Sequence, residues 1–185
     1  MSLEELLSRL APALEQAQVP YMLTGSVASS AHGVPRSTRD LDIVIAPTRA
    51  QLLALMREFP ASQYYADQQQ AMQALAARSQ FNIIDFASGW KVDFIIAQDS
   101  EYGRTALQRR KVIEVAGTAV SVASAEDVLI AKLHWAKLGG SQRQLQDAEG
   151  ILNTQRDNLD FTYIEAWVRE LGLEPQWQTL RQELP

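Results

Sequence analysis

Residues 40–45 read Asp-Leu-Asp-Ile-Val-Ile, and this alternation constrains the fold more than any other feature of the chain. The β-branched run ends at Pro47 and predicts a strand, in which side chains two residues apart share a face. Asp40 and Asp42 therefore lie on one face, while the three apolar residues that alternate with them lie on the other. Because two carboxylates on one face repel each other, a divalent cation between them would account for the pattern.

A third carboxylate, Asp93, stands inside the apolar run 91–97. A lone carboxylate in a buried strand costs free energy. If this strand neighbours residues 41–46, Asp93 completes a three-carboxylate cluster able to hold two Mg²⁺ ions about 3.5–4 Å apart, the spacing of two-metal phosphoryl chemistry. The alternative is an edge strand with Asp93 at its surface.

Gly25 and Ser26 follow a short apolar run, residues 21–24, and precede the small residues 27–31. The order predicts a strand, a glycine turn and a tightly packed helix. Glycine lets the backbone approach a phosphate, and a helix N-terminus offers free N–H groups, to which the Ser26 hydroxyl adds a donor. By itself, the same dipeptide is also compatible with an ordinary turn and helix cap.

Length and composition limit the number of domains, the metal ligands and the partners that the chain can have. The 185 residues suffice for one domain, or for one core with a small helical appendage. No cysteine and only two histidines are present, so a metal would be held mainly by carboxylates, which suits Mg²⁺ or Mn²⁺. The net charge of −5 weakly disfavours a long RNA partner. Two short basic stretches of the sequence are nevertheless compatible with RNA binding. The acidic amphipathic start and the lack of a long apolar run predict a cytoplasmic chain outside the membrane.

The remaining pattern divides the chain into an α/β core, residues 1–122, and a C-terminal helical segment, residues 123–185, packed on the core. Ser2 with Glu5, and Thr48 with Gln51, predict capped helix starts in the core, and hairpins are expected over 81–97 and 112–122. Beyond them, helices are expected from residues 124 and 141. Thr162 with Glu165 predicts a further start, and a last short helix would carry Trp177, Leu180 and Leu184.

At these residues the chain resembles the DNA polymerase β-type nucleotidyltransferase fold superfamily. That pattern is Gly-Ser or Gly-Gly, a spacer, Asp-x-Asp and a third acid on a later strand, and it is matched by Gly25, Ser26, Asp40, Asp42 and Asp93. The resemblance implies an α/β (α+β) fold in which helices flank a mixed β-sheet, followed by the C-terminal helical segment.

The resemblance also implies roles for these residues. Asp40 and Asp42 would coordinate two Mg²⁺ (or Mn²⁺) ions. Asp93 would ligate one of the ions and act as base toward an acceptor hydroxyl, while Gly25 and Ser26 would hold the triphosphate of an NTP substrate.

The spacing Arg36-x-Thr38-x-Asp40-x-Asp42 is also similar to that of small bacterial proteins related to the AbiEii abortive-infection toxins. In those relatives a helical segment with a lysine and then an aspartate follows the core, and residues 123–133 and 143–152 resemble it. The resemblance implies that Lys132 and Asp147 contact the nucleotide or support residues that do. Arg36 and Arg39 flank the acids and are candidates to hold phosphates, and Thr38 is counted with the nucleotide-binding residues.

Three of these residues also have simpler interpretations. Arg36 could belong to a solvated loop. Lys132 could be an exposed helix lysine, and Asp147 could form a surface ion pair with Arg143, four residues earlier.

The function predicted from the sequence is a metal-dependent nucleotidyltransferase that moves an NMP from an NTP to a hydroxyl acceptor and releases pyrophosphate. RNA or tRNA, a protein and a small molecule all remain open as acceptors. An antitoxin-like, non-catalytic NTP-binding module that acts through an operon-encoded partner protein is the alternative. A plain helical interaction protein ranks last because it leaves the three aspartates unexplained. The aromatic helical tail is compatible with an oligomer.

Overall fold

The computed structural model of the protein describes residues 2–182. Internal contacts divide the chain into two compact units. The first runs up to Thr24 and continues over Thr38–Val122, and the second joins Gly25–Ser37 to the chain from Ala123 onward. This division differs from the one expected between residues 122 and 123 in a single segment. Residues 25–37 were expected in the core but belong to the second unit, because they pack with the C-terminal helices.

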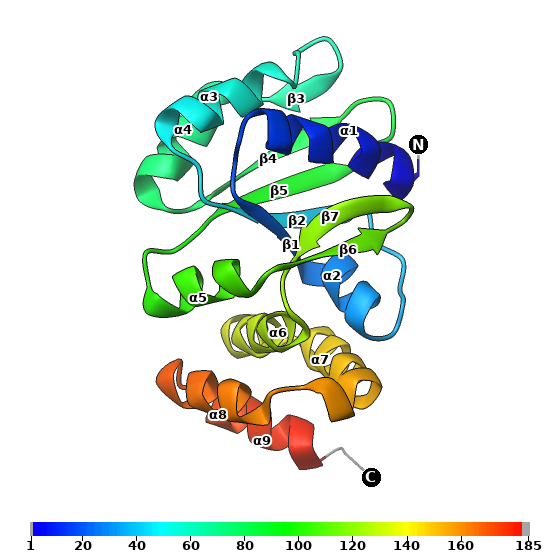
Figure 1. Ribbon diagram of the computed structural model, residues 1–185, viewed down its shortest axis with the longest axis vertical. Coiled ribbons are helices and arrows are strands. Elements are labelled where there is room, and N and C mark those ends of the chain that lie inside the picture. The colour runs from blue at the N-terminus through cyan, green and yellow to red at the C-terminus, as the bar shows by residue number, and fades with distance from the viewer. Residues whose placement is uncertain (1, 183–185) are drawn as a thin grey trace. The chain divides into compact units, whose positions relative to one another are not determined.

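All seven strands in the described part of the chain belong to the first unit and form one mixed sheet, the kind of sheet that the resemblance implied (Figure 1). The order is β3-β4-β5-β2-β1-β7-β6, in which β2 pairs with β5 and β1 pairs with β7 in parallel, and all other pairs are antiparallel. The strands are β1 (Tyr21–Thr24), β2 (Asp40–Ile45), β3 (Tyr64–Ala66), β4 (Gln80–Asp85), β5 (Lys91–Ile96), β6 (Lys111–Val115) and β7 (Thr118–Val122).

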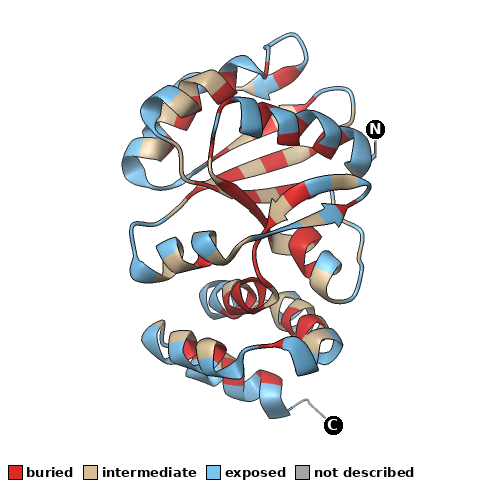
Figure 2. Ribbon diagram, viewed as in Figure 1, coloured by how far each residue is buried: buried red, intermediate tan, exposed pale blue. Residues whose placement is uncertain are grey.

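The central strands alternate between a buried face and a half-buried face, which Figure 2 shows along β2 and β5. Leu41, Ile43 and Phe94 are fully buried on the apolar face. Helices α1 (Leu3–Gln16), α3 (Arg49–Arg57) and α4 (Gln68–Ala77) cover that face (Figure 1). Each fully buried side chain of this kind contributes about 1.5–3 kcal/mol, so the apolar face fixes the register of the strands and therefore the place of the polar side chains between them.

Local capping confirms two helix starts. The Ser2 hydroxyl accepts a hydrogen bond from the Glu5 backbone N–H at 3.2 Å, and the Glu5 carboxylate accepts one from the Ser2 N–H at 2.7 Å. Thr48 and Gln51 form the same reciprocal pair before α3, at 3.3 and 2.8 Å. Both patterns satisfy backbone donors that the first turn of a helix leaves unpaired.

The second unit is helical. Its helices are α2 (Gly25–His32), α6 (Ala125–Gly139), α7 (Gln142–Gln155), the short 3₁₀ helix η1 (Arg156–Asn158), α8 (Phe161–Glu170) and α9 (Glu174–Gln182). The end of α2 approaches α7 closely, since a Cβ atom on Gly33 would lie 2.8 Å from the backbone nitrogen of Ile151. His32 Nε2 is 2.8 Å from the carbonyl oxygen of Ala123, a hydrogen bond that ties α2 to the start of the C-terminal helices.

Three local features differ from the sequence predictions. Strand β3 and helix α5 (Glu101–Arg109) were not predicted; α5 buries only Ala106, so it lacks a wide apolar stripe. Helix α8 begins after Asp160, whose carboxylate accepts from the Tyr163 N–H at 2.9 Å, and the start predicted at Thr162 is wrong by two residues. Leu184 lies outside the described residues. Within residues 2–182, no helix combines the length and apolar character needed to cross a membrane.

Candidate active-site residues

The predicted carboxylates lie on two neighbouring strands of the first unit. In the parallel pairing of β2 with β5, Asp42 lies opposite Asp93 and Asp40 lies opposite Lys91. Strand β5 is internal, with β4 on its other side, so the edge-strand alternative for Asp93 is wrong. Because paired residues and residues two apart share a face, the three aspartates and Lys91 form one polar group, called here the carboxylate cluster with its lysine.

The lysine of this group was not singled out from the sequence. Lys91 Nζ donates to Asp93 Oδ2 at 2.8 Å, with the Lys91 side chain 42% exposed and the Asp93 side chain 15% exposed. The hydrogen bond to Asp93 raises the pKa of Lys91; burial opposes it, and the negative charges of Asp93, Asp40 and Asp42 add to the rise. The available signal was the spacing of Lys91 and Asp93, since residues two apart in a strand point to the same side.

The donor set of the carboxylate cluster suits Mg²⁺ or Mn²⁺, because carboxylate oxygens are the ligands these ions prefer. The register brings the three aspartates to adjacent positions of one face. Over residues 2–182, no three side chains of metal-binding type are gathered closely enough to hold an ion as they stand. Asp93 instead holds the ammonium of Lys91. The three aspartates therefore suit the ion in their chemistry and in their strand positions. One of them, Asp93, is paired with Lys91 in this structure.

Thr38, which was predicted to contact the nucleotide, supports the start of β2. Its hydroxyl accepts from the Asp40 backbone N–H at 3.1 Å and donates to the Asp40 carbonyl oxygen at 3.2 Å. The neighbouring backbone is also paired, since the Lys91 N–H donates to the Arg39 carbonyl at 3.1 Å. These hydrogen bonds fix the backbone at Asp40, the first residue of β2 and the first of the three carboxylates.

In the second unit, Gly25 and Ser26 open helix α2. Gly25 has φ +63°, a left-handed conformation that favours glycine because a side chain would strain it. The Ser26 hydroxyl accepts a hydrogen bond from the Arg36 guanidinium. The turn and helix predicted at this dipeptide are therefore present.

Arg36 also joins an ion network around Asp147. The Asp147 carboxylate accepts from Arg36 Nε at 2.9 Å, from its terminal nitrogen at 3.0 Å, and from Lys132 Nζ at 2.7 Å. The side chains of Lys132 and Asp147 are 2% and 8% exposed. Burial alone would raise the pKa of Asp147, but the hydrogen bonds and charges of Arg36 and Lys132 outweigh it, so the pKa lies below its usual 3.8.

This network corrects two of the simpler interpretations. Lys132 is not an exposed helix lysine, and Asp147 pairs with Lys132 and Arg36 rather than with Arg143 at the surface. The missed signal was helical spacing: Lys132 follows Val128 by four residues and Leu129 by three, and both are fully buried. The structure thus joins Ser26, Arg36, Lys132 and Asp147 within the second unit, while Asp40, Asp42 and Asp93 lie together in the first.

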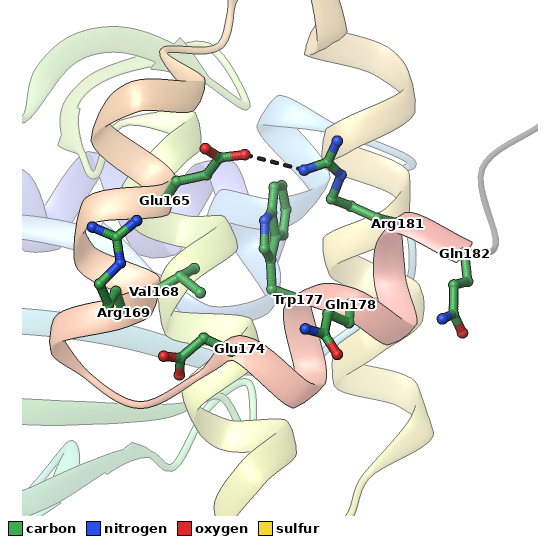
Figure 3. Close-up of a pocket in the computed structure, with 8 residues that line it drawn as sticks. All are labelled: Glu165, Val168, Arg169, Glu174, Trp177, Gln178, Arg181 and Gln182. Carbon is green, nitrogen blue, oxygen red and sulfur yellow. Dashed lines mark hydrogen bonds and ion pairs between the residues drawn. The ribbon is translucent and has the colours of Figure 1, made fainter.

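A separate pocket of about 410 Å³ lies between α8 and α9 (Figure 3) and contains none of the predicted site residues. Arg181 donates to Glu165 at 3.1 Å and lies over the indole ring of Trp177, 5.8 Å from its centroid. Trp177 is buried, as expected of a core aromatic residue, whereas Trp135 is 49% exposed on α6. The pocket therefore reflects the packing of the last two helices.

Comparison with solved structures defines the class to which this architecture belongs. No family model matches the chain, and no curated protein matches its sequence. The seven-stranded mixed sheet with its helices is the nucleotidyltransferase fold, which confirms the fold class predicted from the sequence.

Three structures illustrate the likeness. The antibiotic-resistance factor ANT(2″)-Ia, in complex with adenylyl-2″-tobramycin, is 11% identical, with 98% of each chain covered and a TM-score of 0.54. A Thermotoga maritima protein assigned as a nucleotidyltransferase is 17% identical, with 77% of this chain and 89% of that chain covered and a TM-score of 0.51. An antigenic nucleotidyltransferase-like protein from Paracoccidioides brasiliensis is 17% identical, with 96% of this chain and 91% of that chain covered and a TM-score of 0.51.

Proposed function

We propose that this protein is a metal-dependent nucleotidyltransferase that transfers an NMP from an NTP to a hydroxyl acceptor and releases pyrophosphate. The observation that carries the proposal is the register of β2 with β5, which sets Asp42 beside Asp93 and Asp40 two residues earlier on the same face. The likeness to solved nucleotidyltransferase structures supports it at the level of the fold. A relation to the AbiEii toxin group, suggested by the Arg36-to-Asp42 spacing, is part of the proposal.

Asp40, Asp42 and Asp93 would hold Mg²⁺ or Mn²⁺. Such an ion, when bound, neutralises phosphate charge and favours attack at the α-phosphorus. Asp93 would take the proton of the acceptor hydroxyl. In the overall reaction, the acceptor oxygen forms a bond to the α-phosphorus while the bond from that phosphorus to the bridging oxygen of the leaving pyrophosphate breaks. Catalysis would then rest on positioning and on charge neutralisation.

The second unit offers residues for the phosphates. Gly25 leaves the start of α2 without a side chain, and α2 presents backbone N–H groups there. Arg36 is the most exposed member of the Asp147 network, with 28% of its side chain accessible, so it is the member we expect to contact phosphate. Asp147 would act through Arg36 by accepting from its guanidinium, and Lys132 would act through Asp147 by donating to that carboxylate, because both residues are buried. Thr38 would act through the backbone of Asp40.

For the acceptor we propose a hydroxyl of tRNA, of a protein or of a small molecule. The product bound to ANT(2″)-Ia is an adenylylated aminoglycoside, so compounds of that type belong in the first acceptor set. The AbiEii-like spacing adds tRNA and protein acceptors to the set. The net charge of −5 gives a long RNA no general electrostatic attraction.

One observation favours the alternative function, an NTP-binding module that acts through a partner protein. The Asp93 carboxylate forms an ion pair with Lys91. Among the described residues, the three carboxylates are not close enough together to hold one metal ion as they stand. If Lys91 stayed in place with nucleotide bound, the chain could bind an NTP and yet transfer nothing. Copurification with a second protein, together with binding of NTP but no release of pyrophosphate, would support this alternative.

The experiment incubates the protein and Mg²⁺ with each α-labelled NTP, in the presence of total tRNA, cell protein or aminoglycosides. The variant Asp40→Asn is compared with Asp157→Asn, an exposed aspartate of the second unit. We expect label transfer by the wild type and by Asp157→Asn, and its loss in Asp40→Asn. Transfer that persists in Asp40→Asn would refute the assigned carboxylates. Absence of transfer from every NTP to every acceptor would contradict the enzyme and favour the binding module.

A further inference from the structure

Lys91 occupies a particular position among the carboxylates. It lies opposite Asp40 across the β2–β5 pair, two residues before Asp93 on its own strand. On the other side of β5, Ile84 lies opposite Lys91 and Asn82 lies opposite Asp93. At the positions of β2, β4 and β5 that share this face, Lys91 is therefore the single cationic side chain among three carboxylates.

The ammonium of Lys91 already performs part of what a metal ion would do. It donates to Asp93 at 2.8 Å, and the charges of Asp40 and Asp42 also act on it. Three neighbouring carboxylates without a cation repel one another, so a nearby positive charge stabilises the group. A lysine ammonium is a compact charge on a flexible four-carbon stem, which lets it fill this role and also leave it.

The exposure of the two partners indicates which one moves. Asp93 is held on an internal strand and is 15% exposed, whereas the Lys91 side chain is 42% exposed. Lys91 can therefore swing into solvent without breaking the sheet. A divalent ion bound to Asp93 would repel the ammonium, because both carry positive charge at short range.

We propose that Lys91 is a tethered cation that holds Asp93 while the cluster contains no metal and competes with the divalent ion for that carboxylate. This inference rests on the proposed function, because it requires the cluster to bind a metal. Its consequence is that free metal binds weakly. The triphosphate supplies further oxygen ligands and negative charge, so metal and nucleotide would enter together.

The test measures Mn²⁺ binding without nucleotide, by electron paramagnetic resonance and by calorimetry. The wild type is compared with the neutral variants Lys91→Met and Lys91→Gln, with Lys91→Arg, which keeps the charge, and with Lys111→Met, an exposed lysine of β6. We expect the neutral variants to bind Mn²⁺ about tenfold more tightly, as removal of one charged hydrogen bond predicts, and the two controls to stay within about twofold of the wild type. Thermal unfolding in EDTA should show lower melting temperatures for the neutral variants, and Mn²⁺ should restore them.

The outcomes separate this inference from the proposed function. If the neutral variants bind Mn²⁺ no more tightly than the wild type, while Asp93→Asn weakens binding, the competition is refuted and the metal site stands. If neither the wild type nor any Lys91 variant binds Mn²⁺, both the inference and the metal site of the proposed function fail. Two neutral substitutions are included so that a folding defect in one does not decide the result.

Discussion

Asp147 lies at the centre of the ion network in the second unit, between the Arg36 guanidinium and the Lys132 ammonium. Both Lys132 and Asp147 are almost fully buried, so neither charge can be hydrated if its partner is removed. The network therefore couples the folding of the unit to the orientation of Arg36, the residue that we expect at the phosphates.

We expect Asp147→Leu to lower the free energy of unfolding at pH 7 by about 3–5 kcal/mol, because it removes the carboxylate that accepts hydrogen bonds from the buried Lys132 ammonium and from the Arg36 guanidinium. The double variant Lys132→Met with Asp147→Leu should recover most of this loss, since it removes the buried ammonium together with the carboxylate and leaves only Arg36, whose side chain is 28% exposed. The exposed control Asp157→Asn should stay within about 0.5 kcal/mol of the wild type. Urea unfolding measures all four proteins, and a wild-type stability in Asp147→Leu would contradict the buried pair.

The same residue predicts a pH dependence. The pKa of Asp147 is lowered in the folded chain, so its contribution to stability is complete above the pKa of an unfolded aspartate, about 4, and is lost as the pH falls through the folded value. The difference in unfolding free energy between the wild type and Asp147→Leu should therefore shrink below about pH 4. A difference that stays constant down to pH 2 would show that Asp147 does not supply this charge.

At the scale of single residues, sequence reasoning found the acids more easily than their partners. Asp40, Asp42 and Asp93 break apolar strands and so stand out. Lys91 and Lys132 have a flexible, largely apolar stem that can lie in buried or exposed environments. In the sequence, only their spacing from neighbouring residues indicates which face of the strand or helix carries the ammonium group. The ion pair of Asp147 with Arg36 joins residues 111 positions apart in the chain, and local sequence patterns do not indicate such a pair.

At the scale of elements, strand alternation and helix capping were the reliable signals. The capping pairs at Ser2 and Thr48 are present as predicted, because each satisfies backbone donors within one turn and needs no distant contact. Strand β3 has three residues and α5 buries one, so neither carries a period long enough to identify it. The start of α8 was misplaced because Asp160 and Thr162 are both good N-cap residues two positions apart.

The contact of α2 with α7 gives a prediction at this scale. A Cβ atom on Gly33 would lie 2.8 Å from the Ile151 nitrogen and 2.9 Å from the Gly150 carbonyl carbon, both backbone atoms that cannot turn aside. We expect Gly33→Ala to reduce the free energy of unfolding by about 1–3 kcal/mol.

The matched control for Gly33→Ala is Gly139→Ala at the end of α6, where a Cβ would meet nothing within 4 Å. Its effect should lie between zero and a gain of about 1 kcal/mol. Both variants are measured by urea unfolding. Equal stability of Gly33→Ala and the wild type would mean that the two helices are further apart than described.

At the scale of the whole molecule, the fold is shared with proteins only 11–17% identical in sequence. The mixed sheet itself was expected from the resemblance that the Gly-Ser and Asp-x-Asp pattern carries, while most of its strands could be predicted from their apolar runs. The assignment of residues 25–37 to the second unit could not, since it depends on packing between segments more than 90 residues apart, such as His32 with Ala123.

We propose Asp40, Asp42 and Asp93 as the reacting centre of a nucleotidyltransferase. The most direct test of this claim is the rate of pyrophosphate release by Asp42→Asn, with Mg²⁺, NTP and acceptor, compared with the wild type and Asp157→Asn. Asparagine preserves the shape of the side chain, so we expect the melting temperature to be unchanged and the rate to fall by about a hundredfold or more. A folded Asp42→Asn protein that releases pyrophosphate at the wild-type rate would contradict the claim.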